Sequence, residues 1–163
     1  MRAALLTVFI AAMLIPNGAS AATHYVVGWK TGEKFVFADD QYIHVGTDGV
    51  RIWFHMIFNG SALENNIKST RDLFIMDCNS GRYAVTTSVK YSENGEILNT
   101  EDYTDLPIQW HATIPNSIIE GMSKFACVDQ ATRDSTYPIV APPETDQMEA
   151  DRVYSVIVNK AKP

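Results

Sequence analysis

Cysteine is scarce in this 163-residue chain, which contains only Cys78 and Cys127. A metal site or a catalytic thiol needs further ligands or a positioned histidine near the cysteine, and neither stands at a recognisable spacing. Two cysteines predict a disulfide instead if the chain is exported, and the N-terminal residues 1–21 indicate export. A Cys78–Cys127 bridge closes a loop of ~50 residues, for which the chain-entropy model gives about 4 kcal/mol of stabilisation.

Long hydrophobic runs are also missing. The longest, residues 3–15, is shorter than the ~20 residues that a membrane-spanning helix requires. It follows Arg2 and precedes Pro16, Gly18 and the small triplet Ala19-Ser20-Ala21, an arrangement typical of a secretory signal peptide. No cysteine near the cleavage site is available to accept a lipid. We therefore expect residues 1–21 to be removed, and a protein that is periplasmic, secreted or at the cell surface, without membrane insertion.

Basic residues are too few for binding to nucleic acid. The chain has 13 Lys and Arg against 19 Asp and Glu, a formal charge of -6, and it contains no basic run. An acidic chain of this kind is a poor ligand for nucleic acid or anionic membranes. Removal of the signal peptide leaves about 140 residues, enough for one domain with its own core. We expect a protein partner.

Catalytic motifs are absent as well. The sequence has no Gly-x-Ser-x-Gly motif and no glycine-rich phosphate loop. His44 and His55 could share a sheet face near Asp39 or Asp40, but no metal-ligand spacing is present. The acidic pair Glu101-Asp102 is most simply solvated, although glycosidases use two carboxylates. The sequence therefore predicts a non-enzymatic protein without metal or cofactor. A small hydrolase with a site assembled from distant residues is the remaining enzymatic alternative.

Alternating apolar and polar residues predict a meander of about six antiparallel strands. Asn94-Gly95 and the turn Gly46-Thr47-Asp48-Gly49 mark two hairpins. Asp39-Asp40 interrupts the apolar pattern, and polar residues 59–72 predict a loop. The strands are expected at residues 25–29, 34–38, 42–45, 50–58, 73–78 and 82–91, with a return segment at 96–100.

The strand at 50–58 has one apolar and one mixed face. The core set is Val50, Ile52, Phe54, Met56 and Phe58, and the other face carries Arg51, Trp53 and His55 together with Tyr42 and His44 from the preceding strand. This second face is either covered by a helix or partly open. Lys68, Arg71 and Arg82 flank the strand at 73–78, where a local basic patch would attract an acidic partner segment. Arg51, Trp53, Lys68, Arg71 and Arg82 are therefore the candidate binding residues.

A helix is predicted after residue 117. Ser117 and Glu120 form a capping box, and an apolar stripe follows at Ile118, Ile119, Met122, Phe125 and Ala126. This helix should lie on the sheet, so that Cys127 reaches Cys78. Residues 129–143 read as a connecting segment over the surface. Beyond it, Pro142-Pro143 begins a short helix, whose end at 153–158 is ambiguous between helix and strand. The predicted division is a signal peptide (1–21), a domain (22–128) and a C-terminal segment (129–163).

The order of several motifs resembles the bacterial surface-adhesin E family. The resemblance lies in Phe37-Ala38-Asp39 leading into Tyr42-Ile43, then Val50-Arg51-Ile52-Trp53 and Phe74-Ile75-Met76-Asp77-Cys78, Tyr83, Tyr91-Ser92-Glu93-Asn94-Gly95, Trp110, Ile114-Pro115-Asn116-Ser117 and Phe125-Ala126-Cys127. It covers roughly residues 29–127.

The resemblance implies an α+β fold, in which a single antiparallel sheet of about six strands carries a packed helix tied by the Cys78–Cys127 disulfide. It also implies a binding module, since characterised members of the family attach to host matrix or plasma proteins. Those adhesins resemble lipoproteins with an anchoring cysteine, which this chain lacks. We accordingly expect an exported protein-binding module for host or envelope proteins, with a periplasmic accessory or envelope-maintenance protein as the alternative.

Overall fold

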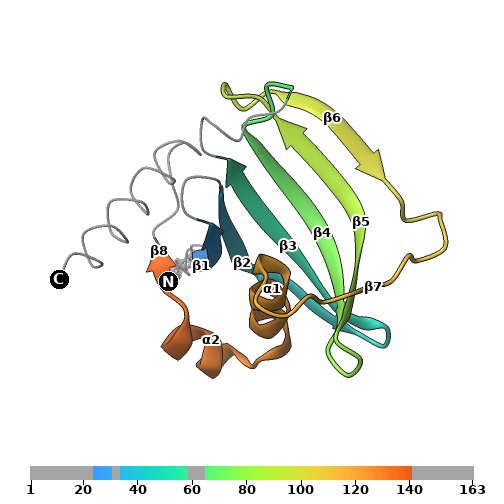
Figure 1. Ribbon diagram of the computed structural model, residues 1–163, viewed down its shortest axis with the longest axis vertical. Coiled ribbons are helices and arrows are strands. Elements are labelled where there is room, and N and C mark those ends of the chain that lie inside the picture. Colours follow the sequence, from blue (N-terminus) through green and yellow to red (C-terminus); the bar gives the residue numbers. More distant parts are fainter. Residues whose placement is uncertain (1–23, 31–33, 59–64, 141–163) are drawn as a thin grey trace, which may run out of the picture.

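The structure is a computed structural model that describes residues 24–30, 34–58 and 65–140. The described chain forms one antiparallel sheet with two helices beside it (Figure 1). The strands are β1 (His24–Lys30), β2 (Lys34–Gly46), β3 (Gly49–Phe58), β4 (Ser69–Asp77), β5 (Arg82–Tyr91), β6 (Ile97–Asp102), β7 (His111–Ala112) and β8 (Ile139–Val140), and the helices are α1 (Ile118–Cys127) and α2 (Gln130–Thr136). The predicted α+β class is confirmed.

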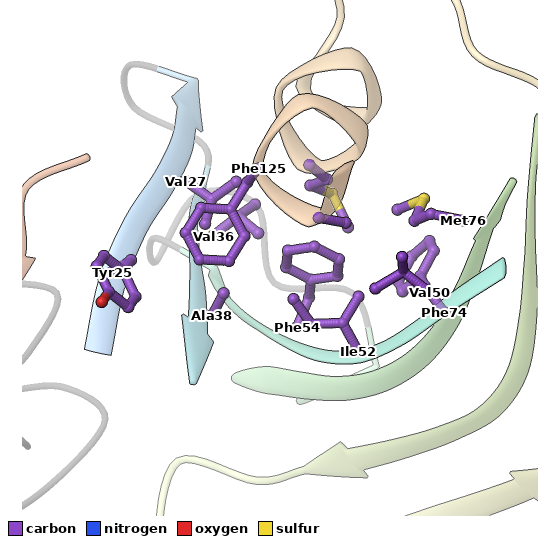
Figure 2. Close-up of a cluster of buried hydrophobic side chains, with 12 residues drawn as sticks. Tyr25, Val27, Val36, Ala38, Val50, Ile52, Phe54, Phe74, Met76 and Phe125 are labelled. Atoms are coloured by element: carbon purple, nitrogen blue, oxygen red, sulfur yellow. The ribbon is translucent and has the colours of Figure 1, made fainter. Parts of the chain in front are cut away.

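The sheet is a meander with strand order β6-β5-β4-β3-β2-β1-β8. Consecutive strands pair antiparallel from β1 to β6, as the hairpin signals predict. The short β7 pairs with β5 on the same side as β6, and β8 pairs with β1 at the opposite end. The central strands bend around α1, which lies on the concave face of the sheet (Figures 1 and 2).

The main core fills the space between α1 and the sheet (Figure 2). Val50, Ile52 and Phe54 are buried there as the alternation in β3 predicts, and Met56 is half-buried against them. The Phe54 ring lies 5.5 Å from Phe74 and 6.4 Å from Phe125 of α1, measured between ring centroids. Because Phe125 is fully buried, it joins the helix to both central strands.

A second, smaller core lies on the other face of the sheet. It consists of Val26, Phe35, Phe37 and Ile57. The register places Ile57 opposite Phe35 and His55 opposite Phe37. This is the face of β3 that was predicted to be aromatic and basic. It is apolar and buried at Ile57, near the C-terminal end of the strand, whereas Arg51 and Trp53, nearer the N-terminal end, are half-buried.

The predicted hairpin between β2 and β3 is confirmed, and it requires glycine. Gly49 has a φ of 136°, and a Cβ at this position would stand 2.4 Å from the carbonyl oxygen of Met76. A side chain would therefore clash with the neighbouring strand backbone. The turn brings Gly46 opposite Gly49 and Val45 opposite Val50.

The predicted capping box and disulfide hold α1 in place. The Ser117 hydroxyl accepts the Glu120 N–H at 3.3 Å, and the Glu120 carboxylate accepts the Asn116 N–H at 2.8 Å. At the other end of the helix, Cys127 is bonded to Cys78, the residue that follows β4. Both ends of α1 are thus attached to defined partners.

The prediction of a plain connecting segment at 129–143 is wrong, because α2 and β8 form there. Asp129 caps α2 by accepting the Thr132 N–H at 2.8 Å. The buried Arg133 donates from Nε to the carbonyl oxygen of Phe125 at 3.0 Å and from Nη2 to that of Ala126 at 2.9 Å. These carbonyls end α1 and lack helical partners. The buried residue of α2 is thus the charged Arg133. A search for apolar periodicity does not detect a helix that packs through a charged side chain.

Two further boundaries differ from the predictions. β2 is continuous across Asp39-Asp40, with a register irregularity between Ala38 and Ile43 instead of a break. β4 begins at Ser69, inside the predicted loop 59–72, because its polar residues Ser69, Thr70 and Asp72 are buried in the ladder between β3 and β5. The predicted signal peptide and the helix predicted from Pro142 lie outside the described residues.

Candidate functional site

The three basic residues expected to form one patch do not come together. Lys68 is buried, with 5 % of its surface exposed. Arg71 is exposed on β4 opposite Val89, whereas Arg82 lies opposite Asp77 at the other end of the β4–β5 pair. At ~3.3 Å per strand residue, the Arg71 and Asp77 positions are about 20 Å apart. A single basic patch is therefore not formed by these side chains.

Arg51 and Trp53 lie on the face of β3 that points away from α1. The Arg51 guanidinium donates to both carboxylate oxygens of Asp48, at 3.0 and 2.6 Å. Trp53 is half-buried opposite Leu73. Arg51 already has an anionic partner within its own hairpin, and the binding role of both residues stays a prediction.

The described residues contain no group of three His, Cys, Asp or Glu side chains placed to hold a metal ion. His44 is exposed and His55 is half-buried on neighbouring strands, while the side chains of Asp39 and Asp40 lie outside the described part. Over the same described ranges, no helix is long and apolar enough to cross a bilayer.

At one edge of the sheet, β5 pairs with two different strands along its length. β5 pairs with β6 through residues 87–91 and with β7 through residues 82–83, so the strand partner changes between them. Residues 103–110 connect β6 to β7 and are held at one end by the Tyr103 N–H, which donates to the carbonyl oxygen of Thr86 at 2.8 Å. A cavity of about 610 Å³ lies between this connection and the sheet, lined by Leu73, Ile75, Tyr83, Leu106, Ile108 and neighbouring residues.

Exposed apolar side chains gather at this edge. They are Ile97 and Leu98 of β6, and Tyr103, Leu106 and Ile108 of the connection, with Leu106 57 % and Ile108 41 % exposed. We call β6 and residues 103–110 the edge surface. Its far end is held by the Arg82 guanidinium, 5.2 Å from the Trp110 ring centroid. Exposed apolar residues along one edge of a folded protein are candidates for an interaction site.

A second hollow opens on the concave face beside α1. Asp72, Ser88 and Glu101 lie side by side on β4, β5 and β6, because the register pairs Asp72 with Ser88 and Ser88 with Glu101. This hollow, about 450 Å³, is also lined by Met56, Phe74, Ile118, Ile119 and Met122. We call it the concave hollow. Tyr83, Val85 and Tyr103 line both cavities, so the edge surface and the concave hollow are neighbours.

The pKa values of the two carboxyls in the concave hollow, Asp72 and Glu101, are shifted in opposite directions. Burial raises the pKa of Asp72, against the hydroxyls of Ser88 and Thr70, which lower it. The pKa of Glu101 is lowered, chiefly by its bond with Lys90 at 2.6 Å and then by the Tyr103 hydroxyl at 2.7 Å. The sequence reading missed Asp72 because it placed this residue in a loop. The alternation of Thr70, Asp72 and Phe74 was the available signal.

The described structure defines a class of protein: a small disulfide-bonded α+β domain in which a curved antiparallel meander carries one helix on its concave face, with exposed apolar side chains along one edge. The family model for surface-adhesin protein E matches residues 25–128, and the chain belongs to this family. No curated protein and no solved structure matches the chain. The resemblance read from the sequence is confirmed, and membership supports a surface-adhesin-like role.

Proposed function

We propose that this protein is an exported, non-enzymatic binding module that recognises a protein partner through the edge surface. The observation that carries the proposal is the group of exposed apolar side chains on β6 and residues 103–110, at the end of the sheet. Family membership supports the same kind of function, because the family is one of surface adhesins. The partner is a host protein or a protein of the bacterial envelope.

The edge surface suits an extended segment of the partner. β6 ends the strand order at this side, and five of its six residues are exposed. A terminal strand offers a row of backbone N–H and C=O groups to which a further strand can pair. Ile97 and Leu98 then contact alternate side chains of the added strand, and Leu106 and Ile108 extend the apolar contact beyond it.

The charge around the edge surface favours a basic partner segment. Glu93 and Glu96 precede β6, Asp102 is its last residue and Asp105 follows it, and all four are exposed. Both cations of β5 already have anionic partners, Lys90 with Glu101 at 2.6 Å and Arg82 with Asp77 at 3.2 Å. Complementary charge steers association and selects among partners. The partner chemistry that fits is an extended segment of alternating apolar and basic residues.

The edge surface is tested by two substitutions against a matched control. Leu106→Glu with Ile108→Glu places charge on the edge surface, while Val45→Glu changes an apolar residue that is 83 % exposed in the β2–β3 hairpin, three strands from β5. Binding of the intact chain to immobilised envelope and host matrix proteins is measured by biolayer interferometry. We expect at least a tenfold loss for the double variant and none for Val45→Glu. Equal losses, or no binding by the wild type at micromolar concentration, would contradict the proposal.

Export is tested separately in the native host. Cell fractionation follows the protein through periplasm, outer membrane and medium, and the intact mass is taken with and without reductant. We expect a chain lacking the signal peptide and lighter by ~2 Da for one disulfide. Recovery at the surface or in the medium favours a host partner, whereas purely periplasmic recovery favours the envelope-accessory alternative. An uncleaved cytoplasmic chain would contradict export.

A further inference from the structure

We propose that the concave hollow is a binding site for a primary ammonium group carried on an aliphatic chain. The site shares Glu101 and Tyr103 with the edge surface but opens on the concave face beside α1, and the inference does not depend on the proposed function. It follows from three features of the hollow: its apolar wall, its buried carboxylate and the arrangement of the charges that face it.

The apolar wall comes from three elements. Met56 of β3, Phe74 of β4 and the α1 residues Ile119 and Met122 line one side of the hollow. These side chains can cover several methylene groups, and each CH₂ removed from water contributes about 0.8 kcal/mol. A ligand that consists only of a charged head would leave this wall uncovered. An aliphatic chain matches it.

The polar wall contains a buried carboxyl, Asp72, which Lys90 influences through space without forming an ion pair with it. Asp72 is 7 % exposed. Its hydrogen-bond donors are hydroxyls, Thr70 Oγ1 at 2.8 Å and Ser88. Among the described residues no Lys, Arg or His nitrogen makes an ion pair with it, and a buried charge supported only by hydroxyls is poorly compensated. An ammonium group brings both the missing charge and three N–H donors.

The other charged groups at the hollow are Glu101, with Lys90 bonded to it, and Lys34. Lys90 of β5 is paired with Glu101, and Glu101 also accepts from the Tyr103 hydroxyl and the Asn99 amide. Lys34 of β2 lines the rim, and its Nζ lies 6.0 Å from the Phe58 ring centroid. The polar wall thus presents Glu101 bonded to Lys90, and Asp72, on which Lys90 acts only at longer range. A carboxylate or phosphate entering the hollow would meet Asp72 directly.

The ligand chemistry has two sources, a free aliphatic amine and the side chain of a lysine in a partner protein. Lysine carries its ammonium on four methylene groups, so both sources match the same walls. Each source has its own probe with matched controls. Nα-acetyl-lysine-N-methylamide represents the lysine side chain, and its Nε-acetylated form, which lacks the charge, is the control. Hexylammonium stands for the free amine, with hexanol and hexanoate as its neutral and anionic counterparts.

The test is titration of the folded, disulfide-bonded chain with these probes, followed by amide chemical shifts of β4, β5 and α1. We expect hexylammonium to bind at least tenfold tighter than hexanol, and hexanoate to give no shifts at the hollow. The affinity for hexylammonium should fall at least tenfold in Asp72→Asn and stay unchanged in Asp129→Asn, a charge control at the exposed N-cap of α2, where Asn caps a helix as well as Asp does. Shifts with the lysine probe but not with its acetylated form would identify the protein side chain as a source.

Several results would overturn the proposal. They are equal affinities for hexylammonium and hexanol, full affinity in Asp72→Asn, and an equal loss of affinity in Asp129→Asn. If Asp72→Asn does not fold, Glu101→Gln tests the same site, because the released Lys90 can then turn to Asp72 and weaken ammonium binding. Since Leu106→Glu with Ile108→Glu should leave hexylammonium binding intact, failure at the edge surface and failure at the hollow are distinguishable.

Discussion

Asp72 makes stability depend on pH through its burial in β4. Burial raises its pKa in the folded protein above the value of 3.8 for a free side chain, so the folded state favours the protonated form. The stability from this group is present below pH 3.8 and is lost as the pH rises through the raised pKa. For each unit of difference the effect is about 1.4 kcal/mol.

We therefore expect Asp72→Asn to remove this loss. Urea unfolding of both proteins between pH 3 and pH 8 should show the variant gaining stability relative to the wild type as the pH rises. Circular dichroism at each pH verifies that both remain folded. Free energies of unfolding that run parallel over the whole range would mean that Asp72 is not responsible.

Asp77 gives the opposite dependence. Its pKa is lowered to about 2 by hydrogen bonds, first from the Ser80 hydroxyl, then from the Ser80 N–H and the Arg82 guanidinium. The carboxylate thus closes the turn between β4 and β5. The stability it contributes is present above pH 3.8 and is lost as the pH falls through about 2.

Asp77→Asn should weaken the turn at neutral pH and remove the loss between pH 4 and pH 2. The carboxyl carbon of Asp77, followed by NMR titration in the wild type, reports its pKa directly. A midpoint near 3.8 would contradict the assignment, and so would an unchanged acid dependence of unfolding in the variant. Asp105→Asn, at an exposed position, is the matched control.

At the scale of elements, the disulfide and the packing against the central strands attach α1 to the sheet. Cys78 and Cys127 are 49 residues apart in sequence, so the bond restricts a long loop in the unfolded chain. We expect the double variant Cys78→Ala/Cys127→Ala to lose about 4 kcal/mol of unfolding free energy. Reductant should lower the stability of the wild type by a similar amount and leave the double variant unchanged. An effect of reductant on the variant would exclude this explanation.

α2 stabilises the end of α1 through one side chain. Arg133→Met keeps the length of the apolar stem and removes the donors to the Phe125 and Ala126 carbonyls. Leaving buried acceptors without donors costs about 1–3 kcal/mol. We expect a loss in this range by thermal and urea unfolding, and less than about 0.5 kcal/mol for Thr136→Ala at an exposed position. Equal losses would mean that the contact is not specific.

At the scale of the whole molecule, stability should decrease from the centre of the sheet to the edge surface. β3 and β4 carry Ile52, Phe54, Ile75 and Met76, which are almost fully buried, whereas β6 is largely exposed. Amide hydrogen exchange should therefore be slowest in β3 and β4 and fast in β6, because local opening of β6 exposes little apolar surface. Equal protection of β6 and β3 would contradict this gradient. A partner bound at the edge surface should slow exchange in β6 selectively.

Much of the fold could be predicted from local signals. The alternation in β3, the Asn94-Gly95 turn, the capping box at Ser117 and the cysteine pair each depend on a few neighbouring residues or on a simple count. The β2–β3 hairpin needed only its glycine turn, since Gly49 alone fits the approach to Met76. These features agree with one another, which is why the α+β meander with a tied helix was predictable.

The candidate site was much less predictable, because it depends on contacts between distant segments. Lys68 was predicted on a surface patch but is buried, while Arg82 is held by Asp77 across the turn. Asp72, Ser88 and Glu101 meet only because three strands pair in a particular register. The exposed apolar group on residues 103–110 likewise requires the change of partner from β6 to β7.

By itself, the sequence determined the class of the domain, its hairpins, its helix on the sheet and its disulfide, because periodicity, turn residues and cysteine count act over short distances or need no geometry. Only the tertiary structure decided that Arg133 binds the last carbonyls of α1, that Ser69 to Asp72 form the start of β4, and that the edge surface and the concave hollow are neighbours. Burial and strand register set these features, and both are properties of the folded chain rather than of any local stretch of residues.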